Sequence, residues 1–188
     1  MVANHIHSLI CSTYGHTLVL FTSYTLMGSV YQILRDSLPF PMVEVWRHSQ
    51  EEILRFKTME NGVLFAAGFC WEGVDFPGDM VSSLIIVKLP FAVPDPISEA
   101  ERETYDSLES YIRSIIVPDM QKKLRQGFGR AIRTETDTCV VSILDIRAVK
   151  GGKYHEEVMC ALPPCQMAEE LREVQDFIRS RKVVEYYL

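Results

Sequence analysis

A ten-residue segment near the middle of the second half of the chain gathers side chains suited to phosphate chemistry. It reads Leu-Arg-Gln-Gly-Phe-Gly-Arg-Ala-Ile-Arg and runs from Leu124 to Arg133. On a helix, Gln126 and Arg130 are four residues apart and Arg133 follows three later, so all three project from one face. Arginine is planar and permanently charged, and its paired N–H donors match the oxygens of a phosphate. The spacing fits a solvated basic helix face equally well, because further basic residues stand just before it.

Two glycines, Gly127 and Gly129, interrupt the same segment. Inside a helix, each costs roughly 1 kcal/mol relative to alanine. This repeated cost beside the arginines indicates that another group approaches the backbone closely here.

The composition restricts the class of protein. The chain has 188 residues, of which 47% are hydrophobic and 23% charged, and this predicts one globular domain rather than a disordered chain. No apolar run approaches the ~20 residues of a membrane span, and residues 1–12 lack the basic start of a secretory signal. The five cysteines include no Cys-x-x-Cys pair, which is typical of buried thiols in a reducing cytoplasm. We therefore expect a cytoplasmic protein without a membrane segment or a bound metal.

Apolar runs of strand length alternate with amphipathic stretches along the chain. The predicted strands are residues 17–22, 42–45, 63–67, 83–89 and 138–144. The predicted helices are residues 1–14 ending at Gly15, 24–36 capped by Ser23, 50–60 opened by a Ser49–Glu52 capping box, 98–116, 118–133 beginning at Pro118, and 168–180. This alternation predicts an α/β domain with a mainly parallel sheet. Ligands of such sheets bind beyond the carboxyl ends of the strands, so the loops after Phe21, Ala67 and Leu144 are the expected functional edge.

The same residues resemble a known family. The pattern Gln-x-x-Gly-Arg-x-x-Arg from Gln126 to Arg133 is similar to motif VI of the superfamily-two helicases. The longer Gln-Gly-x-Gly-Arg-x-Ile-Arg form resembles the DinG branch, which is related to the XPD-type DNA helicases. In the expected order, residues 18–24 resemble motif IV of that family and residues 69–79 resemble motif V. Residues 88–96 and 143–147 also resemble blocks of the family.

The resemblance implies a RecA-like lobe that works as half of a motor. Helicases of this family hold ATP and Mg²⁺ between two RecA-like lobes, and residues 1–188 resemble the C-terminal lobe alone, so the N-terminal ATP-binding lobe of the same protein is the implied partner. In motif VI, Arg130, Arg133 and Gln126 would act at the γ-phosphate, with Gly129 beside them. In motif V, Glu72, Gly73 and Asp75 would couple the nucleotide to the DNA groove, although both acids also suit local pairing with basic residues. The cysteines that hold an iron–sulfur cluster in relatives belong to the first lobe, so no cluster is expected in this chain.

Single-stranded DNA is the second implied partner. The hydroxyl and backbone groups of Thr22, Ser23 and Tyr24 would meet the strand, and Trp71 would stack on a base or, equally well, pack locally. The net charge of −6 opposes general affinity for nucleic acid. The basic residues nevertheless crowd one segment, which contains Lys122, Lys123, Arg125, Arg130 and Arg133.

The departures from a whole motor are as informative as the matches. The sequence contains no Gly-x-x-x-x-Gly-Lys-Ser/Thr, and the nearest segment, Gly151-Gly-Lys153, lacks both the first glycine and the final hydroxyl. We therefore expect the full-length protein to be an ATP-dependent DNA helicase and this chain alone to be inactive. The alternative is a RecA-like module that binds nucleic acid or a protein without enzymatic activity.

Overall fold

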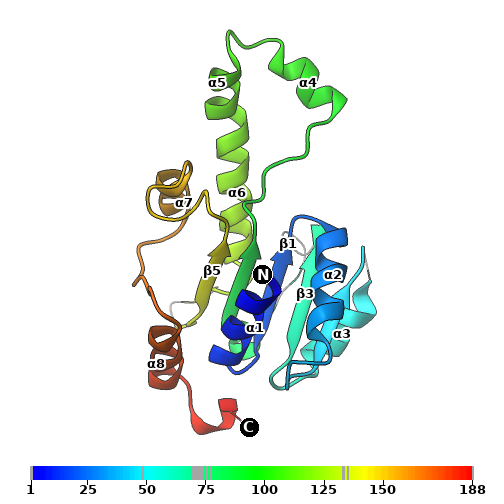
Figure 1. Cartoon of the computed structure of the whole chain (residues 1–188), viewed down its shortest axis with the longest axis vertical. Coiled ribbons are helices and arrows are strands. Elements are labelled where there is room, and N and C mark those ends of the chain that lie inside the picture. Colours follow the sequence, from blue (N-terminus) through cyan, green and yellow to red (C-terminus); the bar gives the residue numbers. More distant parts are fainter. Residues whose placement is uncertain are drawn as a thin grey trace.

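The computed structural model of the chain describes residues 2–47, 49–68, 74, 76, 78–132, 134 and 136–187. Five strands form one parallel sheet in the order β2-β3-β1-β4-β5 (Figure 1). The strands are β1 (Thr17–Phe21), β2 (Met42–Val45), β3 (Val63–Ala67), β4 (Ser83–Val87) and β5 (Val140–Leu144). The helices are α1 (Val2–Ser12), α2 (Tyr24–Leu34), α3 (Gln50–Lys57), α4 (Pro96–Arg102), α5 (Leu108–Tyr111), α6 (Val117–Phe128), α7 (His155–Ala161) and α8 (Leu171–Arg181). The predicted α/β class with a parallel sheet is confirmed.

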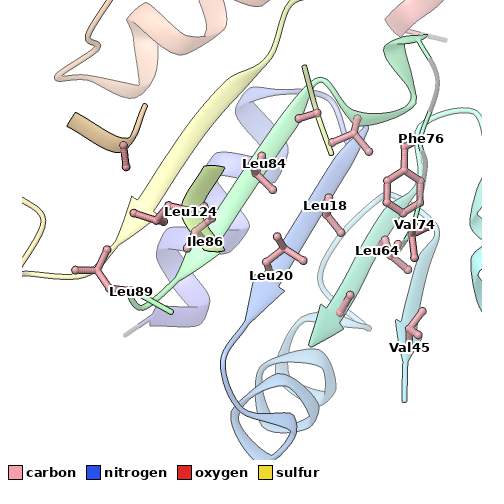
Figure 2. Packing of buried hydrophobic residues seen from close by; sticks show 14 of the residues in the cluster. Leu18, Leu20, Val45, Leu64, Val74, Phe76, Leu84, Ile86, Leu89 and Leu124 are labelled. Carbon is pink, nitrogen blue, oxygen red and sulfur yellow. The ribbon is translucent and has the colours of Figure 1, made fainter. Parts of the chain in front are cut away.

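The three central strands are covered on both faces. Every residue of β1, β3 and β4 is buried, which explains why their sequences are continuous apolar runs. Successive side chains of a strand point to opposite faces, so β1 divides its residues between two cores. Leu18 and Leu20 join the core under α3, α6 and α7, whereas Val19 and Phe21 join the core under α1 and α2. Figure 2 shows the first of these cores, with Leu124 of α6 among the strand leucines.

Local signals in the sequence place several helix ends correctly. Gly15 has a φ of +78° and its N–H donates to the Ile10 carbonyl oxygen, so it ends the first helical segment as predicted. Ser23 caps α2, because its hydroxyl accepts a hydrogen bond from the Leu26 N–H at 3.4 Å. The predicted capping box at Ser49 is wrong: α3 begins there, but the Ser49 side chain makes no capping hydrogen bond.

The segment between β4 and β5 differs most from the prediction. The expected helix over residues 98–116 is instead the short α4, followed by a turn and then α5, which Ser107 caps. Pro118 does not begin a separate helix, because α5 runs through a π-helical turn (Ile112–Ile116) directly into α6. Proline has no N–H to continue an α-helical ladder, and the Val117 N–H reaches back five residues to the Ile112 carbonyl oxygen. Together, α4 and α5 form an arm that projects beyond the sheet (Figure 1).

Other boundaries shift by a few residues for local reasons. The structure ends α6 at Phe128 rather than at Arg133, and Gly129 is its C-terminal cap. β4 ends at Val87 rather than at residue 89, because Lys88 has a φ of +70° and leaves the strand conformation. The helix α7 was not predicted, and α8 begins at Leu171 rather than at residue 168.

The C-terminal segment packs against the amino ends of the central strands. The Tyr186 ring stacks on the His16 ring, with centroids 3.9 Å apart, and the Tyr186 hydroxyl donates to the Thr13 carbonyl oxygen. Burial lowers the pKa of His16 below its ordinary 6.5, which favours the neutral imidazole there. In the part of the chain that the structure describes, no helix is long and apolar enough to cross a bilayer.

The side chain of Lys182 ties this C-terminal segment to two loops. Its ammonium donates to Asp79 at 2.5 Å, to the Thr138 hydroxyl at 2.7 Å and to the Thr138 carbonyl oxygen at 3.2 Å. The Lys182 side chain is only 2% exposed, whereas that of Asp79 is 55% exposed. A buried ammonium with three oxygen partners therefore connects the end of α8 to the segments that precede β4 and β5.

Candidate functional site

Five of the predicted site residues lie outside the described part of the chain. They are the motif V residues Glu72, Gly73 and Asp75, the aromatic Trp71 and the second arginine, Arg133. Their predicted roles stay predictions. The described members are Gln126, Gly129 and Arg130 near the end of α6, and Thr22, Ser23 and Tyr24 after β1.

The topology separates these two groups along the sheet. Thr22, Ser23 and Tyr24 follow the end of β1, so they lie at the carboxyl edge of the sheet. Because β4 and β5 are parallel, their connection must return to the amino end of β5, and α6 is the part of it that crosses the sheet. Arg130, just beyond α6, therefore lies toward the amino ends. The expected functional edge thus holds Thr22, Ser23 and Tyr24, but the phosphate-binding candidate lies elsewhere.

Two hydrogen bonds hold the guanidinium of Arg130. Its Nε–H donates to the Gln126 carbonyl oxygen at 3.2 Å, and Nη1 donates to the Val74 carbonyl oxygen at 2.9 Å. Val74 is buried and belongs to the segment between β3 and β4 that resembles motif V. An arginine has five N–H donors, and its other three make no hydrogen bond to any residue that the structure describes. Two carbonyl oxygens from different segments therefore hold the guanidinium in place.

Gln126 and Gly129 lie close to this arginine. The Gln126 side-chain oxygen is buried and has no hydrogen-bond partner among the described residues. A buried oxygen of this kind costs roughly 1–3 kcal/mol, unless a ligand or water donates to it. Gly129 has an ordinary helical φ of −64°, and an added Cβ would meet the nearest backbone atom at 3.4 Å. None of the described residues therefore requires a glycine at this position.

The predicted DNA-binding residues form a polar corner at the carboxyl edge. Thr22 and Ser23 are exposed, and they precede the first turn of α2. Tyr24 is half-buried, and its hydroxyl donates to the Ala67 carbonyl oxygen at the end of β3, 3.5 Å away. A Cβ at Gly68, where φ is +64°, would come within 2.7 Å of the Tyr24 hydroxyl. The left-handed backbone and the close tyrosine both favour glycine at this position.

An open hollow of about 220 Å³ lies beside this corner, where the carboxyl ends of β1, β3 and β4 meet the base of the arm. Its lining includes Thr22, Gly68, Phe91 and Lys123. The Lys123 ammonium pairs with Asp119 one helical turn earlier, at 3.0 Å. The hollow combines a hydroxyl, a cation and an aromatic ring, which are groups that bind the backbone and bases of a single strand.

Asp145 organises the loops on the other side of the same edge. Its carboxylate accepts a bidentate hydrogen bond from the Arg147 guanidinium, at 2.6 and 3.0 Å, and another from the Leu89 N–H at 2.9 Å. The guanidinium in turn lies over the Phe91 ring, 4.8 Å from its centroid. Burial alone would raise the pKa of Asp145, but the hydrogen bonds, chiefly from Arg147, lower it from 3.8 to about 2. Arg147 is therefore committed to holding these loops together.

This lowered pKa predicts a loss of stability in acid. The carboxylate form of Asp145 is favoured in the folded state, so its contribution is complete above about pH 4 and disappears as the pH falls toward 2. Lowering the pKa of Asp145 from 3.8 to about 2 corresponds to about 2 kcal/mol of folding free energy. The Asp145 side chain is only 5% exposed, so solvent screens this contribution little. Urea unfolding should show the free energy of unfolding falling with pH between pH 5 and pH 2. Asp145→Asn should remove this pH dependence while lowering stability at pH 7. An Asp145→Asn chain with the wild-type pH dependence would contradict the assignment.

Two further residues at the carboxyl edge were missed in the sequence. Trp46 and Arg47 follow β2 directly, and both are exposed. The Trp46 ring stacks on that of Tyr24, with centroids 5.6 Å apart and planes 18° from parallel. Nothing in the sequence marks Trp46, because its partner Tyr24 comes 22 residues earlier in the chain. The exposure of Trp46 cannot be read from the neighbouring residues either.

The described residues place the Arg130 guanidinium just beyond α6 but gather no cluster of metal ligands. No group of three or more metal-ligating side chains gathers within the described ranges. Cys160 and Cys165 are exposed free thiols. The carboxylates and phosphate loop that a nucleotide–Mg²⁺ complex needs would have to come from elsewhere. What the site can supply is positive charge at the end of α6.

The fold and this arrangement define a RecA-like domain that presents an arginine but has no phosphate loop in its sequence. The chain matches the family model described as "Helicase C-terminal domain" over residues 6–165, and it belongs to that family. It is a C-terminal helicase domain of the DinG/XPD type, as the resemblance predicted.

Curated relatives carry the same domain in much longer proteins. The chain is 37% identical over 158 residues to the "ATP-dependent DNA helicase DinG" of Photobacterium profundum, covering 79% of this chain and 23% of that protein. It is 34% identical over 170 residues to the "ATP-dependent DNA helicase YoaA" of Haemophilus influenzae, covering 89% and 26%. It is also 32% identical over 160 residues to the "3'-5' exonuclease DinG" of Bacillus subtilis, covering 81% and 17%. The chain thus spans about a quarter or less of these relatives.

Solved structures confirm the fold. An XPD helicase aligns with a TM-score of 0.67 and 22% identity, covering 85% of this chain and 30% of the other. An apo XPD structure also aligns with a TM-score of 0.67, with 24% identity and coverage of 88% and 35%. The RecA-like architecture expected from the sequence is therefore confirmed.

Proposed function

We propose that this domain is the second motor lobe of an ATP-dependent DNA helicase and supplies an arginine finger to a nucleotide held by another lobe. The observation that carries the proposal is the guanidinium of Arg130, which two hydrogen bonds hold while its other three donors make none to the described residues. The absence of a phosphate-loop sequence supports it, because an isolated arginine cannot bind and hydrolyse ATP. The relatives named as ATP-dependent DNA helicases support the assignment of the activity to the full-length protein.

Arg130 would act by stabilising charge on the phosphoryl group as it is transferred. Charge builds on the phosphate oxygens in the transition state, and a positioned arginine there accelerates nucleotide hydrolysis by ~10³–10⁵. Gln126 would donate to or orient the same group, and Gly129 would leave space for it. Arg133 would be the second cation, while Glu72, Gly73 and Asp75 would relay the nucleotide state toward the DNA. The contact between Arg130 and the Val74 carbonyl oxygen supports such a connection between the two motifs.

Single-stranded DNA would cross the carboxyl edge of the sheet. Thr22, Ser23 and the first N–H groups of α2 would bind backbone phosphates, because a helix N-terminus favours anions. Tyr24 lies at the same corner, and the hollow beside it offers Lys123 and Phe91. Trp71 would add a stacking surface. In this proposal, DNA contacts the carboxyl edge of the sheet, the nucleotide contacts the residues at and just beyond the end of α6, and motif V joins them.

The remaining partners follow from the missing half of the site. We propose that an N-terminal lobe of the same protein holds ATP and Mg²⁺, that residues 1–188 form the C-terminal lobe, and that the protein works in the cytoplasm. The small share of each relative that the chain covers supports a larger whole protein.

Hydrolysis by the full-length protein tests the proposal. ATP turnover should rise at least tenfold on addition of single-stranded DNA, and the isolated 188-residue chain should show none. The readout is phosphate release with and without an oligonucleotide, with strand separation of a tailed duplex as a second assay. A full-length protein that binds single-stranded DNA but never hydrolyses ATP would instead support the alternative, a non-enzymatic interaction module.

A further inference from the structure

We propose that Trp46, supported by Tyr24, is a stacking platform for one nucleobase of a single-stranded nucleic acid. The inference rests on the proposed function and adds a specific binding position to it. The platform is the pair of stacked rings at the carboxyl edge, between the ends of β2 and β1.

The indole of Trp46 is held in place yet remains accessible. Tyr24 stacks against it at 5.6 Å, and a Cβ at Gly28, one turn further along α2, would come within 3.0 Å of its six-membered ring. The missing side chain at Gly28 therefore lets the indole lie against the helix. The Trp46 residue nevertheless stays 47% exposed. A rigid aromatic surface that is supported by its own fold and open to solvent needs little ordering before a base stacks on it.

The platform lies in line with the hydroxyl groups that we assign to the DNA backbone. β2, β3 and β1 are neighbours in the sheet, and Trp46 and Thr22 are each the first residue after their strand. Neighbouring strands are about 4.8 Å apart, so the two strand ends lie about 10 Å from each other. About three nucleotides at a stacked spacing of ~3.4 Å cover this distance. One strand can therefore contact Thr22 and Ser23 through phosphates and place a nearby base on Trp46.

A positive charge stands next to the platform. Arg47 is exposed and has a φ of +50°, a conformation that is uncommon for a residue other than glycine and is often found at binding sites. It forms no ion pair with any residue in the described ranges. An aromatic ring followed by an arginine that pairs with none of the described acids matches a nucleotide, which joins a flat base to an anionic phosphate. An apolar protein partner would leave that charge without a counterpart.

Binding of single-stranded DNA by the full-length protein tests the inference. The probes are an oligo(dT) strand and an abasic strand of the same length, which has the same phosphates but no bases. Trp46→Ala should weaken oligo(dT) binding by about tenfold and leave abasic binding unchanged, whereas Trp46→Phe should retain most of the affinity. The logarithm of affinity against the logarithm of salt concentration should keep its slope in Trp46→Ala, since no charge is lost. Arg47→Gln should reduce that slope by about 0.7.

The controls separate this inference from the function on which it rests. Ile33→Ala removes another exposed apolar side chain, 62% exposed at the far end of α2, and should bind both strands like the wild type. Equal losses on oligo(dT) and abasic DNA would overturn the platform, because they would show a general structural effect. Wild-type oligo(dT) binding by Trp46→Ala would also overturn it, while leaving the helicase assignment intact. A wild-type protein that binds neither strand would contradict both.

Discussion

Substituting Arg130 with alanine in the full-length protein is expected to lower DNA-stimulated ATP hydrolysis by about 10³-fold or more. The guanidinium is placed by the carbonyl oxygens of Gln126 and Val74, and its remaining donors are the ones that would meet the transferring phosphate. An interaction made mainly in the transition state lowers the turnover number rather than nucleotide affinity when it is removed. Steady-state hydrolysis and equilibrium binding of a fluorescent nucleotide should therefore separate, with binding changed by less than about threefold.

Two variants make this result specific to Arg130. Arg125→Ala removes an exposed arginine from α6, five residues before Arg130, and should leave turnover within about twofold of the wild type. Arg130→Lys keeps the charge but loses the planar fork, so turnover should stay at least tenfold below the wild type. If Arg130→Ala and Arg125→Ala behave alike, the segment is a solvated basic face and the finger assignment fails.

Substituting Asp79 with alanine should lower the free energy of unfolding by about 3 kcal/mol. The side chain of Lys182 is 2% exposed, and Asp79 is its anionic partner at 2.5 Å. Removing one partner of a buried ion pair costs roughly 3–5 kcal/mol, and the lower limit applies here because Asp79 is half exposed and screened and because Lys182 keeps its two hydrogen bonds to Thr138. Urea unfolding of the chain measures the change directly. The melting temperature should fall by about 6–12 °C, since each kcal/mol lowers it by roughly 2–4 °C in a domain of this size.

A double variant distinguishes a buried Lys182 ammonium that has lost its anionic partner from a simple loss of contacts. Lys182→Met keeps most of the buried side-chain volume and removes the ammonium, so the Asp79→Ala, Lys182→Met chain should be more stable than Asp79→Ala alone. A second substitution that restores stability lost in the first is expected only for residues that interact directly. Additive losses in the two single variants would show that Lys182 contributes through packing alone.

The buried strands and the ends of the first helices could be predicted from the sequence because their signals are local. All five residues of β1 are apolar or buried polar, and Gly15 and Ser23 act on their own neighbours. The arm could not be predicted, because no local pattern shows that the chain accommodates the missing N–H of Pro118 with a π-helical turn. The capping box at Ser49 had the right residue types, but the side chain does not make the bond.

The candidate site was predictable as a set of residues but not as an arrangement. The spacing of Gln126 and Arg130 indicated a shared face, whereas the segment that receives Arg130 lies 56 residues away in the sequence. Lys182 is 103 residues from Asp79, so no local pattern marks either residue as a partner. Trp46 is inconspicuous for the same reason: its importance comes from Tyr24 and Gly28 on another element.

The π-helical turn also sets the direction in which the arm faces. One added residue in a helix turns everything beyond it by about 100° and advances it by about 1.5 Å. The wider turn at Ile112–Ile116 absorbs one such residue between α5 and α6. In an alignment of relatives, a single-residue gap in this stretch would therefore mean that the arm is rotated by more than a quarter of a turn about the α6 axis. Relatives with identical motifs at the sheet would then present different faces of α4 and α5 to a ligand bound at the carboxyl edge.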